Sequence, residues 1–190
     1  MSPTRRTEEI WDTAEKLFSQ YGYHATTMRR IASELGLEGG SLYAHIESKE
    51  EVLRAVIRRA GDQFLQTLEP IASSDAPPAD KLRTAIRAHV RLVADDLDAA
   101  TVYFHEWRFL QPKYRGSVLQ RRDAYEQMFR KIITEGIEAG VFRDYDRKFA
   151  TILILSACNW LYHWYDLAGP LSPEEIADLF TDMILEGLLK

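Results

Sequence analysis

The sequence predicts an all-α protein of about nine helices, and three observations lead to that prediction. Apolar residues recur at helical spacing over most of the chain, and no stretch shows a convincing strand pattern. Gly22 and Gly140 follow such stretches directly, as glycines at the C-terminal ends of helices do. Ser48 and Ser172 each precede a Glu by three residues, which is the pattern of a helix-capping box.

The first predicted helix covers residues 5–21. Its inward stripe consists of Ile10, Ala14, Leu17, Phe18 and Tyr21. A much longer helix is predicted over residues 49–71. Its inward stripe consists of Leu53, Val56, Ile57, Ala60, Phe64 and Leu68. We expect its first turns to pack against the residues before it and its last turns to belong to a second domain, so that it links the two.

Residues 26–49 lie between these two helices and read TTMRRIASELGLEGGSLYAHIESK. A short helix is predicted over residues 27–35, a turn at Gly36, and a second helix near residues 39–46. Leu42 and Ile46 would face inward, leaving polar and aromatic residues to face out. A helix, a tight glycine turn and a second helix form the helix-turn-helix pattern.

The side chains of this stretch suit double-stranded DNA. The Thr27 hydroxyl can cap its helix beside free backbone N–H groups, and arginine guanidinium groups can contact guanine edges or phosphates. The glycines allow close approach to the groove. The predicted DNA contacts are Thr27, Arg29, Arg30, Gly39, Gly40, Ser41, Tyr43, His45 and Lys49. The alternative is an ordinary helical hairpin with solvated charges.

The same stretch resembles the DNA-binding domain of the TetR family of bacterial transcriptional regulators. The resemblance covers about the first 60 residues. It rests on Tyr21-Gly22-Tyr23, Thr26-Thr27, Ile31-Ala32, Gly36-Leu37, Leu42-Tyr43, His45 and Ser48-Lys49-Glu50-Glu51. Members of that family often carry a small hydroxyl residue and a Lys where this chain has Glu38 and Gly39. This departure removes one expected phosphate contact and adds a negative charge.

Residues 72–79, ASSDAPPA, form the linker-like segment of the chain. Beyond it we expect a helix carrying the apolar stripe Leu82–Val93, a short apolar piece over residues 99–110 that stops before Pro112, and a helix over residues 118–139. We divide the chain into a helix-turn-helix DNA-binding domain, residues 1–48, and a ligand-binding and dimerisation domain, residues 49–190.

The last two predicted helices differ from the others. Residues 149–165, FATILILSACNWLYHWY, are apolar nearly all round but are short for a membrane span and contain Asn159 and His163. The final helix begins at Pro173 after a Ser172 cap. Two adjacent apolar helices suit a four-helix dimer interface, which the resemblance also implies. A homodimer would match the two half-sites of a palindrome.

Aromatic residues concentrate in the second half of the chain, together with a few polar ones. We expect an apolar ligand pocket there with polar anchors, lined by Trp107, Arg108, Tyr125, Phe129, Trp160 and His163. The C-terminal segment resembles TetR-family members that sense acyl-CoA thioesters. For such a ligand, Arg108 or the Arg121–Arg122 pair would meet the phosphates. The alternative is that these rings are core or dimer contacts.

Charge, cysteine content and the absence of known motifs limit the functions that the chain could have. The net charge is −5, and residues 1–60 hold nine Lys and Arg against nine Asp and Glu, so DNA binding depends on where the cations lie. Cys158 is the single cysteine and excludes an internal disulfide, and no signal peptide is visible, so we expect a cytoplasmic protein. No motif of a catalytic site, metal site or cofactor is present.

We therefore predict a ligand-responsive, DNA-binding transcriptional regulator and not an enzyme. Its expected partners are an operator in double-stranded DNA, a small effector such as an acyl-CoA, and a second copy of the chain, with no membrane and no cofactor. The alternative is an all-helical interaction module that has lost DNA binding.

Overall fold

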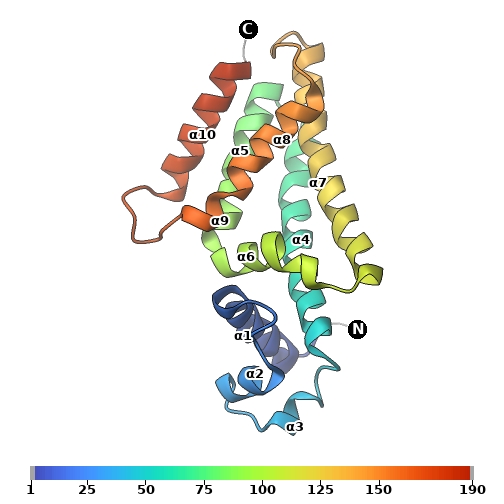
Figure 1. Cartoon of the computed structure of the whole chain (residues 1–190). Helices are drawn as coiled ribbons and strands as arrows, with labels where there is room; N and C mark the ends of the chain where they lie inside the picture. Colours follow the sequence, from blue (N-terminus) through green and yellow to red (C-terminus); the bar gives the residue numbers. More distant parts are fainter. Residues whose placement is uncertain (1–2, 189–190) are drawn as a thin grey trace. The chain divides into compact units, whose positions relative to one another are not determined.

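The computed structural model describes residues 3–188, which form helices joined by turns and loops, with no strand in that part of the chain (Figure 1). The helices are α1 Arg5–Tyr21, α2 Met28–Glu34, α3 Gly39–Leu42, α4 Lys49–Ala72, α5 Pro78–Asp95, α6 Leu97–His105, the 3-10 segment η1 Glu106–Phe109, α7 Pro112–Glu138, α8 Arg147–Asn159, α9 Leu161–Trp164 and α10 Pro173–Leu188. The predicted all-α fold is confirmed.

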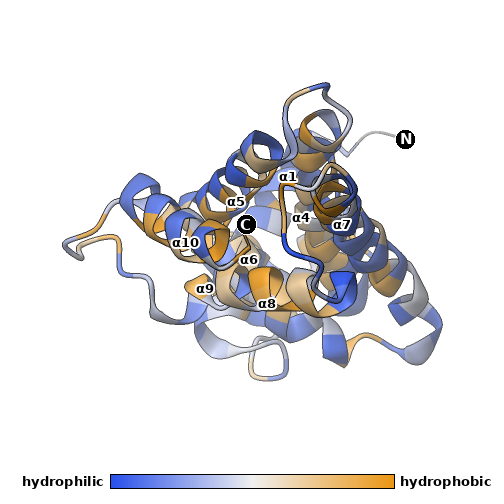
Figure 2. Ribbon diagram, turned by 90° about the horizontal axis from the view of Figure 1, so that it is seen from above, coloured by the Kyte–Doolittle hydropathy of each residue, from blue (hydrophilic) through white to orange (hydrophobic). Residues whose placement is uncertain are grey.

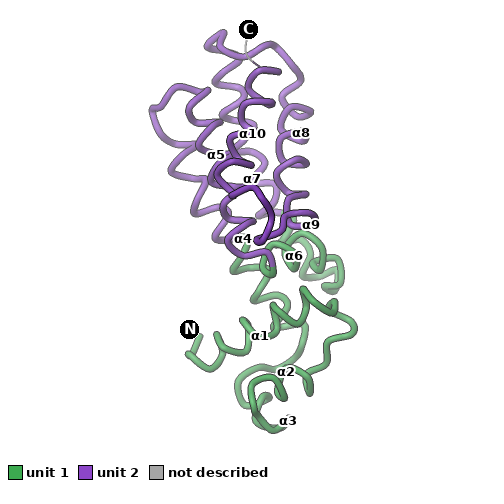
Figure 3. Tube along the Cα trace, turned by 90° about the vertical axis from the view of Figure 1, so that its left-hand side faces the viewer, with its two compact units in different colours: residues 1–61, 98–119 green, residues 62–97, 120–190 purple. Residues whose placement is uncertain are grey.

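These helices pack into two compact units (Figure 3). Unit 1 holds the residues up to Gly61 together with Asp98–Leu119, and unit 2 holds Asp62–Leu97 and the residues from Gln120 onward. Helices α4 and α7 therefore each contribute residues to both units. The predicted DNA-binding domain, residues 1–48, does not include the second stretch of unit 1.

Helix α1 opens unit 1 with the bounds that the sequence predicts. Four residues of its predicted stripe, Ile10, Ala14, Leu17 and Phe18, are buried. Tyr21 is 48% exposed, so its assignment to the core stripe is wrong. It lies at the last position of the helix, just before Gly22 turns the chain away with a φ of 80°. The core that covers the earlier residues does not reach it.

The turn between α2 and α3 depends on Gly36, whose φ is 66°. The Leu37 N–H donates to the Ala32 carbonyl at 2.8 Å, which closes the end of α2. Helix α3 spans four residues and is followed by a turn, whereas the sequence predicted a helix near residues 39–46. Two glycines at its start have low helix propensity, and no side chain caps them.

Capping fixes the start of α4. The Ser48 hydroxyl accepts from the Glu51 N–H at 3.1 Å, and the Glu51 carboxylate accepts from the Glu47 N–H at 2.6 Å. Helix α10 starts with a reciprocal capping box, because Ser172 and Glu175 each accept from the other's backbone N–H at 3.2 and 2.7 Å. Both starts agree with the sequence prediction.

In unit 2, α5 packs against α8, α9 and α10. Helix α7 begins at Pro112, six residues before the predicted start at Val118. Proline stops a preceding helix but also favours the first turn of the next one, and the prediction considered only the first effect. The predicted helix over residues 149–165 is interrupted at Trp160, which separates α8 from α9.

Candidate functional site

Most of the predicted DNA contacts in the helix-turn-helix stretch of unit 1 are exposed. Thr27 caps α2, and its hydroxyl accepts from the Arg30 N–H at 3.1 Å. Arg29 and Arg30 are exposed on α2. The Arg30 guanidinium carbon lies 3.5 Å from the centroid of the Tyr21 ring. At this distance the exposed Tyr21 ring attracts the guanidinium through a cation–π contact.

The second half of the motif also separates core from surface as predicted. Leu42 and Ile46 are buried, while Ser41, Tyr43 and His45 are exposed. A Cβ on Gly40 would meet no atom within 4 Å, so open space lies over the start of α3, which Gly39 begins. Glu38 is exposed immediately before that start and does not cap it.

Lys49 lies differently from the other predicted DNA contacts. Its ammonium donates to the Tyr23 carbonyl at 2.8 Å and to the Thr26 carbonyl at 2.7 Å, and it lies 4.3 Å from the centroid of the Tyr23 ring. Partial burial lowers the pKa of this ammonium. Lys49 thus fastens the loop between α1 and α2, which is a structural role that the sequence analysis did not predict.

Cations at the start of α1 are already paired. Arg5 and Arg6 both contact the Glu9 carboxylate, at 3.2 and 2.7 Å. Exposed pairs of this kind are weak, so both arginines can exchange Glu9 for another anion at little cost.

The six predicted ligand-binding residues fall in both units. Trp107 and the exposed Arg108 belong to unit 1, whereas Tyr125, Phe129, Trp160 and His163 belong to unit 2. Within unit 2, Tyr125 and Phe129 are buried and their ring centroids are 5.5 Å apart. Trp160 and His163 are exposed, and their rings lie 4.3 Å apart on the surface.

Tyr125 and Phe129 are part of a larger buried cluster that includes Phe64 and His89. The Phe64 centroid lies 5.2 Å from that of His89 and 5.5 Å from that of Tyr125. His89 Nδ1 and the Tyr125 hydroxyl are 2.9 Å apart. Burial lowers the pKa of His89 to about 3, with a hydrogen bond to Asn159 acting in the opposite direction, so the imidazole is neutral at pH 7.

His89 is a polar site residue that the sequence analysis missed. The available signal was a histidine inside the apolar stripe of residues 82–93, which indicates a buried side chain in need of a polar partner. Tyr125 supplies that partner from α7. Arg121, one of the arginines considered for ligand phosphates, forms an ion pair with Asp62 at 2.7 Å.

The described part of the chain shows no reactive cysteine, metal site or membrane-spanning helix. Burial raises the pKa of the Cys158 thiol to about 12, so this cysteine is a poor nucleophile. Among residues 3–188, no three His, Cys, Asp or Glu side chains gather as metal ligands would. None of the helices in that range has the length and hydrophobicity needed to cross a bilayer.

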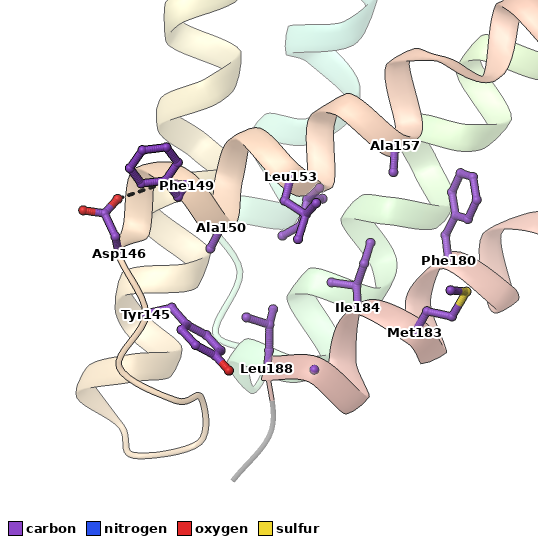
Figure 4. A pocket seen from close by; sticks show the side chains of 12 residues that line it. Tyr145, Asp146, Phe149, Ala150, Leu153, Ala157, Phe180, Met183, Ile184 and Leu188 are labelled. Carbon is purple, nitrogen blue, oxygen red and sulfur yellow. Dashed lines mark hydrogen bonds between the residues drawn. The ribbon is translucent and has the colours of Figure 1, made fainter.

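Hydrophobic residues run along α8 (Figure 2), and several large apolar side chains of α8 to α10 in unit 2 are exposed; we call this the outer face of α8 to α10. Large exposed side chains gather there: Phe149, Ile152, Leu153, Trp160, Trp164, Leu167, Leu179 and Met183. Leu153 is 68% exposed and Met183 is 73% exposed. A groove of about 720 Å³ runs between α8 and α10, and most of its lining side chains are apolar, with Phe149, Leu153 and Met183 among them (Figure 4). Apolar exposure on this scale marks an interaction surface.

Comparisons with known proteins cover both halves of the chain. Residues 10–56 match the family described as bacterial regulatory proteins, tetR family, and residues 75–188 match the tetracyclin repressor-like C-terminal domain. The second match alone spans more than half of the chain. The HTH-type transcriptional repressor KstR2 of Mycobacterium tuberculosis is 28% identical over 187 residues, which are 97% of this chain and 94% of that protein.

Solved structures agree with the sequence matches. The TetR family transcriptional regulator PfmR from Thermus thermophilus superposes with a TM-score of 0.88 at 33% identity, covering 95% of this chain and 99% of that one. AibR, solved in complex with isovaleryl coenzyme A and operator DNA, superposes with a TM-score of 0.87 at 27% identity, covering 94% and 97%. These proteins share the fold and the arrangement of helices described above.

Proposed function

The chain belongs to the TetR family of bacterial regulatory proteins, and from that premise we propose that it is a ligand-responsive repressor that binds a palindromic operator as a homodimer. The observation that carries the proposal is the exposed set of polar and cationic side chains on α2, α3 and the following turn. Their apolar neighbours are buried, so the motif is rigid enough to enter a major groove.

The proposed DNA contacts divide into three groups. Arg29, Arg30 and Ser41 are exposed and can meet base edges or phosphates, and the open space over Gly40 lets the start of α3 approach the groove. Tyr43 and His45 offer hydrogen bonds to phosphate oxygens. Lys49 adds positive charge close to the DNA backbone even while its ammonium holds the loop between α1 and α2.

The proposed dimer uses the outer face of α8 and α10. A second copy of the chain is the occupant that suits this face, because twofold symmetry places the same apolar residues on both sides. A homodimer also presents two reading motifs to the two half-sites of an operator. A protein that acts on chromosomal DNA works in the bacterial cytoplasm, where we place it.

The proposed effector is an apolar acyl compound such as an acyl-CoA thioester. AibR, whose fold this chain shares, has been solved with isovaleryl coenzyme A. The buried cluster of Phe64, His89, Tyr125 and Phe129 supplies rings for an acyl chain and a neutral His–Tyr pair for its carbonyl oxygen. Trp160 and His163, which are exposed in the same unit, are the further residues of the proposed lining. Effector that binds the non-DNA conformation more tightly releases the operator, and the ratio of the two affinities sets the extent of release.

Selection of duplexes from a random pool, followed by titration with acyl-CoAs of increasing chain length, tests the proposal. We expect a palindrome to be enriched and to be released by one range of chain lengths, with each added CH₂ strengthening binding by about 0.8 kcal/mol until the site is full. A folded dimer that enriches no sequence would instead support the interaction module. The even charge balance of residues 1–60 and the exposed Glu38 favour that alternative.

A further inference from the structure

The loop between α1 and α2 is held by a part of the chain that lies far from it in sequence. This loop, residues 22–26, sets the direction in which α2 and α3 leave α1. Residues 98–119 belong to the same compact unit as the loop. Within them, Glu106 contacts the loop although 83 positions separate it from Tyr23.

Glu106 is a buried carboxylate whose two oxygens are both engaged. Its residue is 4% exposed. Oε2 accepts from the Tyr23 backbone N–H at 2.7 Å, and Oε1 lies 2.9 Å from His105 Nδ1. A backbone donor bonded to an ionised acceptor forms a stronger bond than a neutral pair does. Loss of the acceptor would leave the Tyr23 N–H without this partner in a part-buried setting.

Further contacts secure the same loop. The Lys49 ammonium binds the Tyr23 and Thr26 carbonyls, so an anion holds the donor of Tyr23 while a cation holds its acceptor. The Phe109 ring stacks on the Tyr23 ring, with centroids 6.3 Å apart, and meets the His24 ring edge-on at 4.4 Å. The loop is therefore fixed by its backbone and by its rings together.

A second carboxylate joins the same two stretches of unit 1. Glu50, in the first turn of α4, accepts from both the backbone N–H and the side-chain amide of Gln111 at 2.7 Å each. The Arg54 guanidinium carbon lies 3.8 Å from the centroid of the Tyr114 ring. These exposed contacts align residues 106–114 beside the loop. Among the groups that connect the two stretches, the Glu106 carboxylate is the buried one.

We propose that Glu106 is a positioning residue for DNA recognition. Its carboxylate fixes the Tyr23 N–H and thereby the orientation of the helix-turn-helix relative to α1. The inference rests on the proposed function, because orientation matters only if α2 and α3 read DNA. It also deepens that function, since displacing residues 106–109 would remove a bond on which operator binding depends.

Three substitutions distinguish the positioning role of Glu106 from an effect of its charge and from a general effect on folding. Glu106→Gln keeps an oxygen that can accept from the Tyr23 N–H and a nitrogen that can donate to His105, but it removes the negative charge. Glu106→Ala removes the same charge and the acceptor as well. Glu106→Asp keeps the charge but stops one carbon short, and it carries the test if the alanine variant fails to fold. Each full-length variant is titrated with the operator selected by the wild type and with a scrambled duplex at one salt concentration.

We expect Glu106→Gln to bind the operator as the wild type does, and the alanine and aspartate variants to bind it about tenfold more weakly. Binding to the scrambled duplex should be equal in the two variants that lack the charge. Equal operator affinity of Glu106→Ala and Glu106→Gln would overturn the proposal. A role limited to overall stability would lower the melting temperature without changing the ratio of operator to scrambled affinity, which would also overturn it.

Amide hydrogen exchange keeps the test independent of DNA binding. Exchange over residues 22–26 should be faster in Glu106→Ala than in Glu106→Gln, with exchange at Phe18 unchanged. If the wild type enriches no operator, the proposed function fails, and this measurement alone decides whether Glu106 positions the loop. Equal exchange in the two variants would then overturn the inference.

Discussion

Because His89 is buried, we expect the folded protein to lose stability in mild acid. Its pKa is about 3 in the folded protein against an ordinary value of 6.5, so between these values the unfolded chain binds more protons than the folded one. Folding stability therefore falls as the pH drops below 6.5 and continues to fall until about pH 3. Between pH 7.5 and pH 5, only the part below 6.5 contributes, which is about 1.5 pH units. At about 1.36 kcal/mol per pH unit, the free energy of unfolding falls by about 2 kcal/mol.

Substitution by glutamine isolates this effect. His89→Gln keeps a polar partner for the Tyr125 hydroxyl but has no proton to gain. Urea unfolding of the wild type and the variant at pH 7.5 and pH 5 gives four free energies of unfolding. We expect the wild type to lose about 2 kcal/mol more than the variant between the two pH values. An equal loss in both proteins would refute the reasoning, because His89 would then titrate alike in the folded and unfolded states.

Substitutions at three further positions test other parts of the structure. Gly136→Ala should lower the free energy of unfolding by about 1–3 kcal/mol in urea, because the new Cβ would lie 2.1 Å from the buried Phe142 ring; unchanged stability would mean that the ring moves freely. Tyr21→Leu should weaken operator binding about two- to fivefold, whereas Tyr21→Phe should not, since only the leucine removes the ring beneath Arg30. Met183→Glu should leave the protomer folded, because the residue is 73% exposed, yet sediment as a monomer at micromolar concentration; a persisting dimer would exclude the α8–α10 face as the interface.

The sequence predicted those parts of the fold that depend on neighbouring residues. Gly22 and Gly36 adopt positive φ, and the Ser172 box starts α10, because each of these features is decided within a few positions of the chain. The exposed side of the reading motif could be predicted for the same reason, since helical spacing separates Leu42 and Ile46 from their polar neighbours.

The parts that could not be predicted depend on contacts between distant residues. Glu106 looks like any solvated acid in the sequence, and only the fold places its carboxylate on the Tyr23 N–H. Lys49 has the spacing of a phosphate contact, yet the two carbonyls that it binds lie 23 and 26 positions earlier. The proposed effector region shows the same limit, because aromatic composition does not distinguish the buried Phe129 from the exposed Trp160.

Unit 1 is built from two stretches of chain, which has a consequence for its synthesis. A ribosome makes the chain from its N-terminus, so residues 98–119 emerge well after the residues of the helix-turn-helix have been made. Until then the Tyr23 N–H has no carboxylate partner and the rings of Tyr23 and His24 lack Phe109. The helix-turn-helix of the growing chain therefore lacks these contacts while α5 is being made. A fragment that ends at Gly61 should be loose in the loop of residues 22–26. A chimaera that exchanges the DNA-reading part between relatives needs both stretches.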